Sequence, residues 1–508
     1  MRLSLPLAAA MSAGLLAVAP AMAQTPQAAA DRLDAFLDRF GGIEPGYAVV
    51  VVTADEILMN RVEGVRSSET GAPLTADTPI YIASQTKAYI GLLAAALDAR
   101  GILDLDSAIA DHWPQAVFPG DTDPAAWTLR DLLTHQVPIE VEELTWLEAY
   151  AVRVDPADYP RLIAEHGEVR EPGFRYDNLG YNIYAAILES TTGRSWQDWL
   201  DEVVFDPLGL ENTSARTSDF STDTLSWNHI WQGEAAGWHA VPPKTDAMMQ
   251  SAGGLVTSPA DMAVWLQLQL RGAGPDGSGI AAQTVEAAQT SYVDTHQEDG
   301  RNAYELPCSG YSLGWNVCDF DGHELLIHGG GYTGARSVMA FSPDLGVGIA
   351  VFSNSDNMTG WLSGRTVVMF LQFLTEDPEA ERWADIRVDY YPEQVQRLLD
   401  HRASREAEVR AEERWSGWVW QPGPAVLADY AGRYDLGDGY RIVEVREEAG
   451  RLVASLGDAR YWLEPARPDL FGGVSFPFDT PDAFGFRRDA GGRIAALDWD
   501  GDLYERVE

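Results

Sequence analysis

The segment from Ile80 to Gly101 constrains the fold more than any other part of the chain. Residues 80–83 form a short strand-like run that leads directly to Ser84, and residues 85–100 are mostly apolar and rich in strong helix formers. Gly101 is a typical C-terminal stop for such a helix. A helix that is apolar on most of its surface has to be buried. The sequence therefore predicts a fold built around this helix, with Ser84 at its N-terminal end.

Lys87 stands three residues after this serine and is one of only two lysines in the chain. Lysine and arginine together number 36, so arginine supplies the other 34 positive charges. Lysine can lose its proton, whereas arginine stays charged in proteins. Burial and the positive end of the helix dipole both favour the neutral amine. Ser84 and Lys87 therefore predict a nucleophile beside a general base on one helix face; the alternative is a surface lysine.

A second motif, Tyr-Asp-Asn at residues 176–178, lies at a predicted junction between a loop and a helix. Its functional interpretation makes Tyr176 a proton carrier and Asn178 a tether that can both donate and accept hydrogen bonds. The alternatives are a half-buried aromatic residue and a helix cap.

A third motif begins with His328, which ends a predicted strand and precedes Gly329, Gly330 and Gly331. Glycines in a strand let a substrate or another backbone approach closely. The alternatives are a structural histidine and a glycine turn.

These three motifs, in this order and at these intervals, resemble the serine β-lactamase and penicillin-recognising peptidase superfamily. The most similar branch holds class C β-lactamases, D-alanyl-D-alanine carboxypeptidases, D-aminopeptidases and related esterases. Stretches at residues 128–135, 251–257 and 310–315 also resemble that branch. The resemblance covers about residues 30–375, and residues from about 426 to 508 look like the lipocalin-like module appended to many members.

The resemblance implies that Ser84 forms an acyl-enzyme and that Lys87 and Tyr176 share the proton transfers. It implies that Asn178 holds Lys87 and the substrate amide, and that no cofactor or metal takes part. The oxyanion hole would consist of the backbone N–H groups of Ser84 and Gly331.

In the same resemblance, the backbone of Gly329 and Gly330 would line the substrate cleft. One stretch departs from the family: residues 136–138 are Gln-Val-Pro, where a Ser-Gly step is common, which puts the nearby cleft wall in doubt.

His328 bears on the substrate, because many β-lactamases have a lysine at this position and a histidine is largely neutral near pH 7. By resemblance, a histidine here is more typical of peptidases, aminopeptidases and esterases. The expected substrates are small amides, peptides or esters of the D-amino-acid type. The alternatives are a β-lactamase and a sensor that binds penicillin or peptidoglycan without turnover.

The order of elements predicts an α+β fold in which an antiparallel sheet is flanked by helices and joined to an all-helical cluster. A small all-β barrel-like domain follows. We expect a hydrolase domain at residues 24–375, a helical linker at 376–425 and the barrel at 426–508. Strands are expected at 46–52, 57–63, 313–318, 324–328, 335–341 and 346–352, and helices at 28–40, over most of 104–170, and at 178–192, 259–270, 359–373 and about 392–414.

Residues 1–23 predict a cleavable export signal, with one arginine, an apolar run and a small-x-small cleavage site. We therefore expect a periplasmic or secreted protein without a membrane span. The formal net charge of −41 argues against nucleic acid and anionic lipid as partners. A small-molecule or peptide substrate is the expected partner, and a monomer is favoured.

The only two cysteines, Cys308 and Cys318, predict a disulfide in an oxidising compartment, worth about 3 kcal/mol by loop entropy. Two buried thiols are the alternative.

Three further patterns imitate functional motifs. Ser312 lies in a G-x-S-x-G pattern, but no helix is predicted after it, as a nucleophile elbow requires. Lys244 imitates a K-T-G motif without its glycine, and we interpret it as a loop lysine on the cleft rim. Residues 498–502 imitate a calcium loop but lack the distant glutamate, which favours a polar hairpin.

Overall fold

The computed structural model describes residues 25–43, 45–297, 304–355, 360–475 and 480–507. The predicted export signal at residues 1–23 lies outside these ranges. No helix in the described part of the chain combines the length and the apolar character that crossing a bilayer requires.

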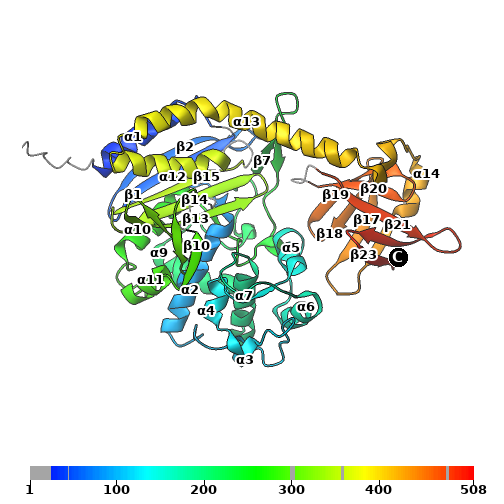
Figure 1. Ribbon diagram of the computed structural model, residues 1–508, viewed down its shortest axis with the longest axis horizontal. Coiled ribbons are helices and arrows are strands. Elements are labelled where there is room, and N and C mark those ends of the chain that lie inside the picture. The colour runs from blue at the N-terminus through cyan, green and yellow to red at the C-terminus, as the bar shows by residue number, and fades with distance from the viewer. Residues whose placement is uncertain (1–24, 44, 298–303, 356–359, 476–479, 508) are drawn as a thin grey trace, which may run out of the picture.

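A nine-stranded antiparallel sheet forms the centre of the larger part of the molecule (Figure 1). Its order is β10-β11-β12-β13-β14-β15-β1-β2-β3, so the N-terminal hairpin pairs with the last strand of the C-terminal run. This arrangement confirms the predicted sheet built from strands at both ends of the sequence. The strands are β1 (Gly46–Thr53), β2 (Ile57–Ser67), β3 (Ala72–Pro73), β10 (Val293–Gln297), β11 (Cys308–Tyr311), β12 (Asn316–Phe320), β13 (His323–Tyr332), β14 (Ala335–Ser342) and β15 (Val347–Ser353).

Strand β1 separates two hydrophobic cores because successive side chains of a strand point to opposite faces. Its odd-numbered residues 47, 49 and 51 pack with α1 (Pro26–Asp38) and α12 (Gly360–Leu374). Its even-numbered residues 48, 50 and 52 pack with α2 (Thr86–Ala99) and α10 (Pro259–Arg271). The sheet is therefore covered on both faces, and α2 is enclosed as its apolar sequence predicts.

The helical cluster contains fewer helical residues than the sequence predicts. Residues 104–170 were expected to be mainly helical, but they form short helices joined by loops and two-residue strands. Capping residues and prolines interrupt the pattern, since Asp123, Asp155 and Thr128 each accept a backbone hydrogen bond at a new helix start. The elements are α3 (Ile109–His112), α4 (Leu129–Leu133), β5 (Ile139–Glu140), α5 (Glu142–Tyr150), α6 (Tyr159–His166) and β6 (Glu168–Val169).

Between residues 178 and 290 the predicted helices are present, and elements that the sequence did not reveal lie between them. Helix α7 (Leu179–Thr192) ends at Gly193, which is left-handed at φ 68°. The further elements are α8 (Trp196–Leu200), α9 (Asp206–Leu208), β7 (Asn228–Trp231), β8 (Trp238–Val241), β9 (Val256–Thr257) and α11 (Ala282–Gln289).

Helix α13 (Ala380–Arg410) connects the sheet to the C-terminal part and begins twelve residues before the predicted start. The sequence pattern predicts a helix that begins at about Pro392, but this proline lies inside the helix. Salt bridges from α1 to Glu381 and Asp385 hold the earlier turns, which local propensity alone does not indicate.

The C-terminal strands close into an eight-stranded antiparallel barrel, which confirms the predicted all-β module (Figure 1). Two residues of the α5 segment, Leu147 and Ala151, belong to the hydrophobic core that this barrel builds. The short helix α14 (Pro424–Leu427) precedes the strands, which are β16 (Gly432–Asp435), β17 (Ile442–Glu448), β18 (Arg451–Leu456), β19 (Ala459–Arg467), β20 (Leu470–Val474), β21 (Asp482–Arg488), β22 (Ile494–Trp499) and β23 (Asp502–Arg506).

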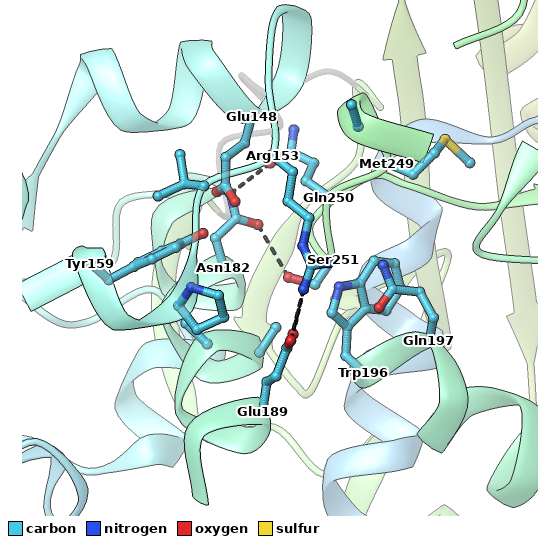
Figure 2. Close-up of a pocket in the computed structure, with 15 residues that line it drawn as sticks. Glu148, Arg153, Tyr159, Asn182, Glu189, Trp196, Gln197, Met249, Gln250 and Ser251 are labelled. Carbon is cyan, nitrogen blue, oxygen red and sulfur yellow. Dashed lines mark hydrogen bonds and ion pairs between the residues drawn. The ribbon is translucent and has the colours of Figure 1, made fainter. Parts of the chain in front are cut away.

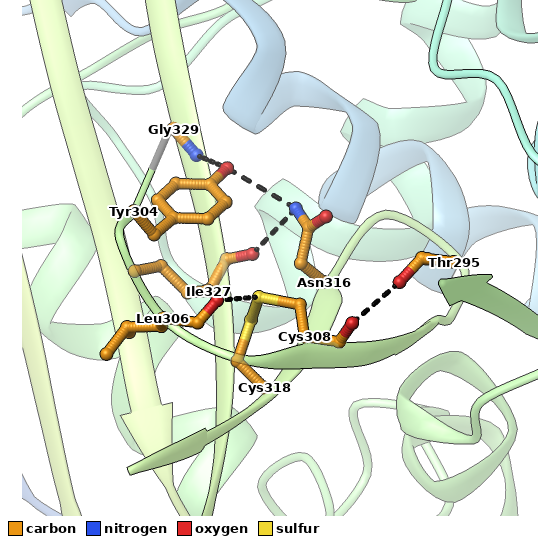
Figure 3. The surroundings of a disulfide bond; sticks show 8 residues. All are labelled: Thr295, Tyr304, Leu306, Cys308, Asn316, Cys318, Ile327 and Gly329. Carbon is orange, nitrogen blue, oxygen red and sulfur yellow. Dashed lines mark hydrogen bonds between the residues drawn. A yellow bond between two sulfur atoms is a disulfide. The ribbon is translucent and has the colours of Figure 1, made fainter. Parts of the chain in front are cut away.

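Cys308 and Cys318 form a disulfide between the paired strands β11 and β12 (Figure 3). The two residues face each other directly in the register of the pair. Both are buried in the core between the sheet, α1 and α12. The bridge therefore links β11 to β12, and β12 is the strand that pairs with β13, which carries His328.

Candidate active site

Ser84 lies in a single turn, η1 (Ala83–Gln85), immediately before α2. The turn follows β4 (Ile80–Tyr81), which pairs with β9. Ala83 has a positive φ of 47°, a conformation that costs a residue other than glycine about 1–3 kcal/mol. The Ser337 hydroxyl donates a hydrogen bond to the carbonyl of Ile82 at 3.2 Å and helps to hold this turn. The predicted nucleophile therefore occupies a fixed, strained junction at the start of a buried helix.

Lys87 is fully buried in the first turn of α2. Its Nζ atom lies 2.8 Å from Asn178 Oδ1, 2.8 Å from the carbonyl oxygen of Ala252 and 3.3 Å from Ser84 Oγ. Burial lowers the pKa of Lys87 to about 7, although the negative charge of Asp177 acts in the opposite direction. A large fraction of the amine is therefore neutral near pH 7, which fits the role that the Ser84–Lys87 motif predicts.

The Tyr176 hydroxyl forms a hydrogen bond with the Ser84 side chain. Its ring lies over Lys87, with Nζ 4.8 Å from the ring centroid, while the side chain remains 42% exposed. Burial of the hydroxyl end raises the pKa of Tyr176 well above its ordinary value, and the bond with Ser84 only partly offsets this. Tyr176 therefore keeps its proton at neutral pH.

Asn178 is the N-cap residue of α7, but its side chain does not cap the helix. The amide oxygen instead accepts a hydrogen bond from Lys87, and Asp177 accepts one from the backbone N–H of Gly180. The contact with Lys87 is one of the two that the tether interpretation predicts, and the side chain makes no capping bond.

His328 is buried in β13, and both of its ring nitrogens have partners. Nδ1 lies 2.8 Å from the carbonyl oxygen of Gly329 and Nε2 lies 3.2 Å from the Tyr311 hydroxyl. Because a carbonyl can only accept, Nδ1 carries the proton and Nε2 accepts from Tyr311. Burial, and then the charge of Lys87, lower the pKa of His328 to about 3, so the ring is neutral.

The three glycines after His328 continue the strand instead of forming a turn. A side chain at Gly330 would clash with the carbonyl oxygen of Ile82, so only glycine lets β13 pass this close to the Ser84 turn. The N–H of Gly329 donates to the Tyr304 hydroxyl at 2.9 Å. Gly331, the predicted oxyanion donor, follows these two residues and pairs with Arg336 of β14.

Several residues around the site were not singled out from the sequence. His135 is buried against the ring of Tyr176 at 4.7 Å between centroids, and its Nδ1 accepts from the N–H of Asp177. His135, Tyr311 and Ala252 lie in the three secondary stretches that resemble the family, which was the only available signal. No sequence signal indicates Tyr304.

A polar network behind the site positions the Ala252 carbonyl. The Asn182 side chain accepts from the N–H of Ala252 at 3.2 Å and donates to Glu148 at 2.7 Å. Figure 2 shows Glu148 and Asn182 beside a cavity of about 30 Å³, enough for a water molecule. Burial raises the pKa of Glu148 to about 7. This cavity lies on the far side of the peptide that binds Lys87 and does not include Ser84.

Lys244 is buried rather than exposed on a rim, which corrects the sequence interpretation. Its Nζ donates to the carbonyl oxygens of Ala149 at 2.7 Å and Met248 at 3.3 Å. The amine lies 4.0 Å from the ring centroid of Tyr332. Burial lowers the pKa of Lys244 to about 7. Aromatic rings brought together from distant segments create this site, so the short K-T sequence could not reveal it.

The other two motif-like patterns, at Ser312 and at residues 498–502, have structural roles. Ser312 is fully buried, its hydroxyl and N–H both face the carbonyl of Trp315, and β12 follows where an elbow requires a helix. Residues 498–502 span the end of β22, the turn at residues 500–501 and the start of β23. The residues that the structure describes contain no group of three or more His, Cys, Asp or Glu that could hold a metal ion.

Sequence comparison finds relatives over the part of the chain that contains the site. The family profile described as Beta-lactamase matches residues 33–368. Penicillin-binding protein 4 of Amycolatopsis lactamdurans is 26% identical over 328 residues, which cover 63% of this chain and 83% of that protein.

Comparison with solved structures of similar fold covers a larger share of this chain. The octameric penicillin-binding protein homologue from Pyrococcus abyssi has a TM-score of 0.57 at 18% identity and covers 96% of this chain and 100% of its own. D-amino acid amidase from Ochrobactrum anthropi SV3, complexed with L-phenylalanine, has a TM-score of 0.56 at 20% identity and covers 69% and 99%. At these identities the likeness concerns the fold. The first alignment covers the barrel as well as the sheet.

Proposed function

The chain belongs to the Beta-lactamase family, and we propose that it is a serine hydrolase that works through an acyl-enzyme on Ser84. One observation carries this proposal: a buried amine with a pKa of about 7 lies 3.3 Å from the Ser84 hydroxyl. A general base is most effective when its pKa lies near the operating pH.

The contacts of Lys87 favour it as the base for attack. A neutral amine has two N–H groups and one lone pair. Asn178 Oδ1 and the Ala252 carbonyl, both at 2.8 Å, take the two N–H groups, which leaves the lone pair directed at Ser84 Oγ. Lys87 then accepts the hydroxyl proton as Oγ attacks the substrate carbonyl.

Tyr176 is suited to the opposite role. Its raised pKa makes it a poor base but lets it hold a proton beside Ser84 until the leaving group needs one. In our proposal Tyr176 donates that proton and is reprotonated from Lys87. A water molecule then attacks the acyl-enzyme, neutral Lys87 takes the proton that the water loses, and this proton passes to Ser84 Oγ as the ester bond breaks and the acid product leaves. The N–H groups of Ser84 and Gly331 would stabilise the oxyanion.

The proposed substrates are small amides, peptides or esters of the D-amino-acid type. The neutral, fully hydrogen-bonded His328 places no fixed positive charge where many β-lactamases have a lysine. The similarity in fold to a D-amino acid amidase supports the same choice. With the predicted export signal, we propose that hydrolysis takes place outside the cytoplasm.

One observation favours a β-lactamase as the second candidate. Arg336 is exposed, and its guanidinium lies where a side chain on Gly331 would point. A cation beside the proposed oxyanion hole suits a substrate with a carboxylate, such as a β-lactam.

A panel of p-nitrophenyl esters, D-amino-acid p-nitroanilides and a chromogenic cephalosporin tests both candidates, together with a fluorescent fluorophosphonate label. We expect labelling at Ser84 and fastest turnover of a D-amino-acid amide or ester. Ser84→Ala should abolish labelling and turnover, whereas the matched control Ser312→Ala should retain the label. Permanent labelling by a fluorescent penicillin without hydrolysis of any substrate would instead indicate a sensor, and labelling at another residue contradicts the proposal.

A further inference from the structure

A second cavity lies where α5 meets the open end of the barrel. Its volume is about 350 Å³, which is in the range of small-molecule sites. It belongs to neither the Ser84 site nor the small cavity beside Glu148. Figure 1 shows the barrel beside α5, the helix that contributes one wall. The residues around it are Glu142, Glu143, Trp146, Arg441, Leu456, Tyr461, Asp482, Trp499, Asp500, Asp502 and Tyr504.

The charge of this cavity is strongly negative, with five carboxylates and one arginine around it. The arginine offsets only one of the five, because Arg441 pairs with Asp502 at 2.8 Å and otherwise with Asp438, outside the cavity lining, at 2.6 Å. Burial, and then the charge of Asp500, raise the pKa of Asp482 to about 6. The carboxylates are therefore held close together without a matching positive charge from the described residues that line the cavity.

The remaining walls are aromatic and include two tyrosine hydroxyls without a hydrogen-bond partner among the described residues. Tyr461 and Tyr504 are each 97% buried, and neither hydroxyl has a hydrogen-bond partner in the described ranges. The Tyr461 hydroxyl lies in the field of Asp482 and Asp500. The rings of Trp499 and Tyr461 lie 5.0 Å apart, and Trp146 closes the α5 side with its ring 6.1 Å from that of Trp499. Both hydroxyls are therefore free to bind a ligand that enters the cavity.

The arrangement selects the chemistry of that ligand. The carboxylates are too dispersed to chelate, since the described residues contain no cluster that could hold a metal ion. Aromatic faces combined with carboxylates bind organic cations, as in the cages that recognise quaternary ammonium groups. We propose that the cavity between α5 and the barrel binds an organic ammonium group.

A path of aromatic rings connects this cavity with the Ser84 site. The ring of Trp146 lies 6.2 Å from that of Tyr150, and Tyr150 stacks on Tyr332 at 5.5 Å. Tyr332 directly follows Gly331 in the chain. The ammonium group can therefore belong to a separate ligand or to the far end of a long substrate.

Binding is tested with the full chain carrying Ser84→Ala, so that turnover plays no part. Choline is titrated by calorimetry against its neutral isostere 3,3-dimethylbutan-1-ol, because fluorescence from 17 tryptophans would not report on one site. We expect choline to bind at least about tenfold more tightly than the alcohol. Adding Asp482→Asn and Asp500→Asn should weaken choline at least about tenfold, whereas the control Glu447→Gln, exposed on β17, should not.

Asparagine tolerates the positive φ of 56° at residue 500, so the double variant should fold, and thermal unfolding checks this. If the double variant does not fold, choline must still raise the melting temperature of the Ser84→Ala protein more than the alcohol does. Equal binding of choline and alcohol, absence of choline binding, or an equal effect of Glu447→Gln overturns the proposal.

A second experiment identifies the molecule that carries the cation. This experiment rests on the proposed hydrolase function, whereas the choline titration is independent of it. It compares two peptide p-nitroanilides that differ only by lysine in place of norleucine. If the Asp482→Asn/Asp500→Asn variant has a higher KM than its parent for the lysine peptide and an unchanged KM for the norleucine peptide, the cation belongs to the substrate. A change in p-nitrophenyl acetate hydrolysis on adding choline assigns it to a separate ligand.

Discussion

Lys87 and Lys244 both lie in buried regions, and both amines have a lowered pKa and two hydrogen-bonded oxygen atoms. They differ in the third group that each amine contacts. Burial lowers the pKa of both to about 7, and each Nζ donates to two oxygen atoms. Beyond those two bonds, Lys87 faces the Ser84 hydroxyl, whereas Lys244 faces the ring of Tyr332. Burial therefore brings the pKa of each amine into the range that suits a general base. In the described part of the chain, only Lys87 also has a hydrogen-bonded hydroxyl from which it can take a proton.

The contacts of the second lysine explain why position 244 holds lysine in a chain so rich in arginine. Lys244 joins the carbonyl of Ala149, at the end of α5, to that of Met248, just before the peptide that presents Ala252 to Lys87. The amine sits among the rings of Tyr81, Tyr150 and Tyr332. A permanently charged guanidinium would pay a larger desolvation cost in this setting than an amine that can become neutral.

Replacing each lysine by methionine gives the largest expected contrast. Lys87→Met should lower kcat/KM by about 10²–10⁴-fold, because it removes the general base. Lys244→Met should change kcat/KM by less than about tenfold, because no hydroxyl of the described residues forms a hydrogen bond with that amine. Steady-state kinetics on the best substrate of the panel measure both, with melting temperatures as the folding control. Equal losses in the two variants would contradict the distinction.

Asn178→Asp should move the acid limb of the pH profile of kcat/KM. A carboxylate in place of the amide oxygen, now 2.8 Å from Nζ, stabilises the charged amine and raises the pKa of Lys87. Because only the neutral amine acts as base, the acid limb near pH 7 should shift upward by about one to three units. In Lys244→Met the limb should stay in place. An unshifted limb in Asn178→Asp argues that another group is the base.

The difference in stability between the wild type and Lys244→Met should depend on pH. An unfolded lysine keeps its proton to about pH 10.4, whereas folded Lys244 loses it near pH 7. Between these values the unfolded chain binds one more proton, so this lysine makes the wild type more stable as pH rises, by up to about 1.4 kcal/mol per unit. Urea unfolding at pH 7 and pH 9 should show the wild-type advantage growing with pH. A constant difference would mean that Lys244 titrates alike in both states.

The smallest effect concerns the ring that Lys244 faces. Tyr332→Leu should cost about 0.5–2 kcal/mol more at pH 6, where the amine is charged, than at pH 9, where it is neutral, because a ring face attracts only the cation. A double-mutant cycle with Lys244→Met separates this term from the loss of stacking on Tyr150. A coupling that is the same at both pH values rules out a cation–π contribution.

Sequence reasoning was most successful where one short segment carries the information. The burial of α2, the position of Asn178 at the start of α7 and the strands on either side of Ser342 all follow from local periodicity and turn residues. It was wrong for residues 104–170 and for Pro392, where capping side chains and salt bridges to α1 decide where helices begin. The environment of Lys244 was also missed.

The amino-acid sequence by itself determined which residue types stand one helical turn apart and which segments must be buried. Only the tertiary structure decided the state of the two amines. Asn178 and Ala252 lie 91 and 165 positions from Lys87, and the rings around Lys244 come from three separate segments. The pKa of an amine depends on how far water is excluded from it and on which dipoles lie near it. Both are decided when distant segments of the chain pack around the amine.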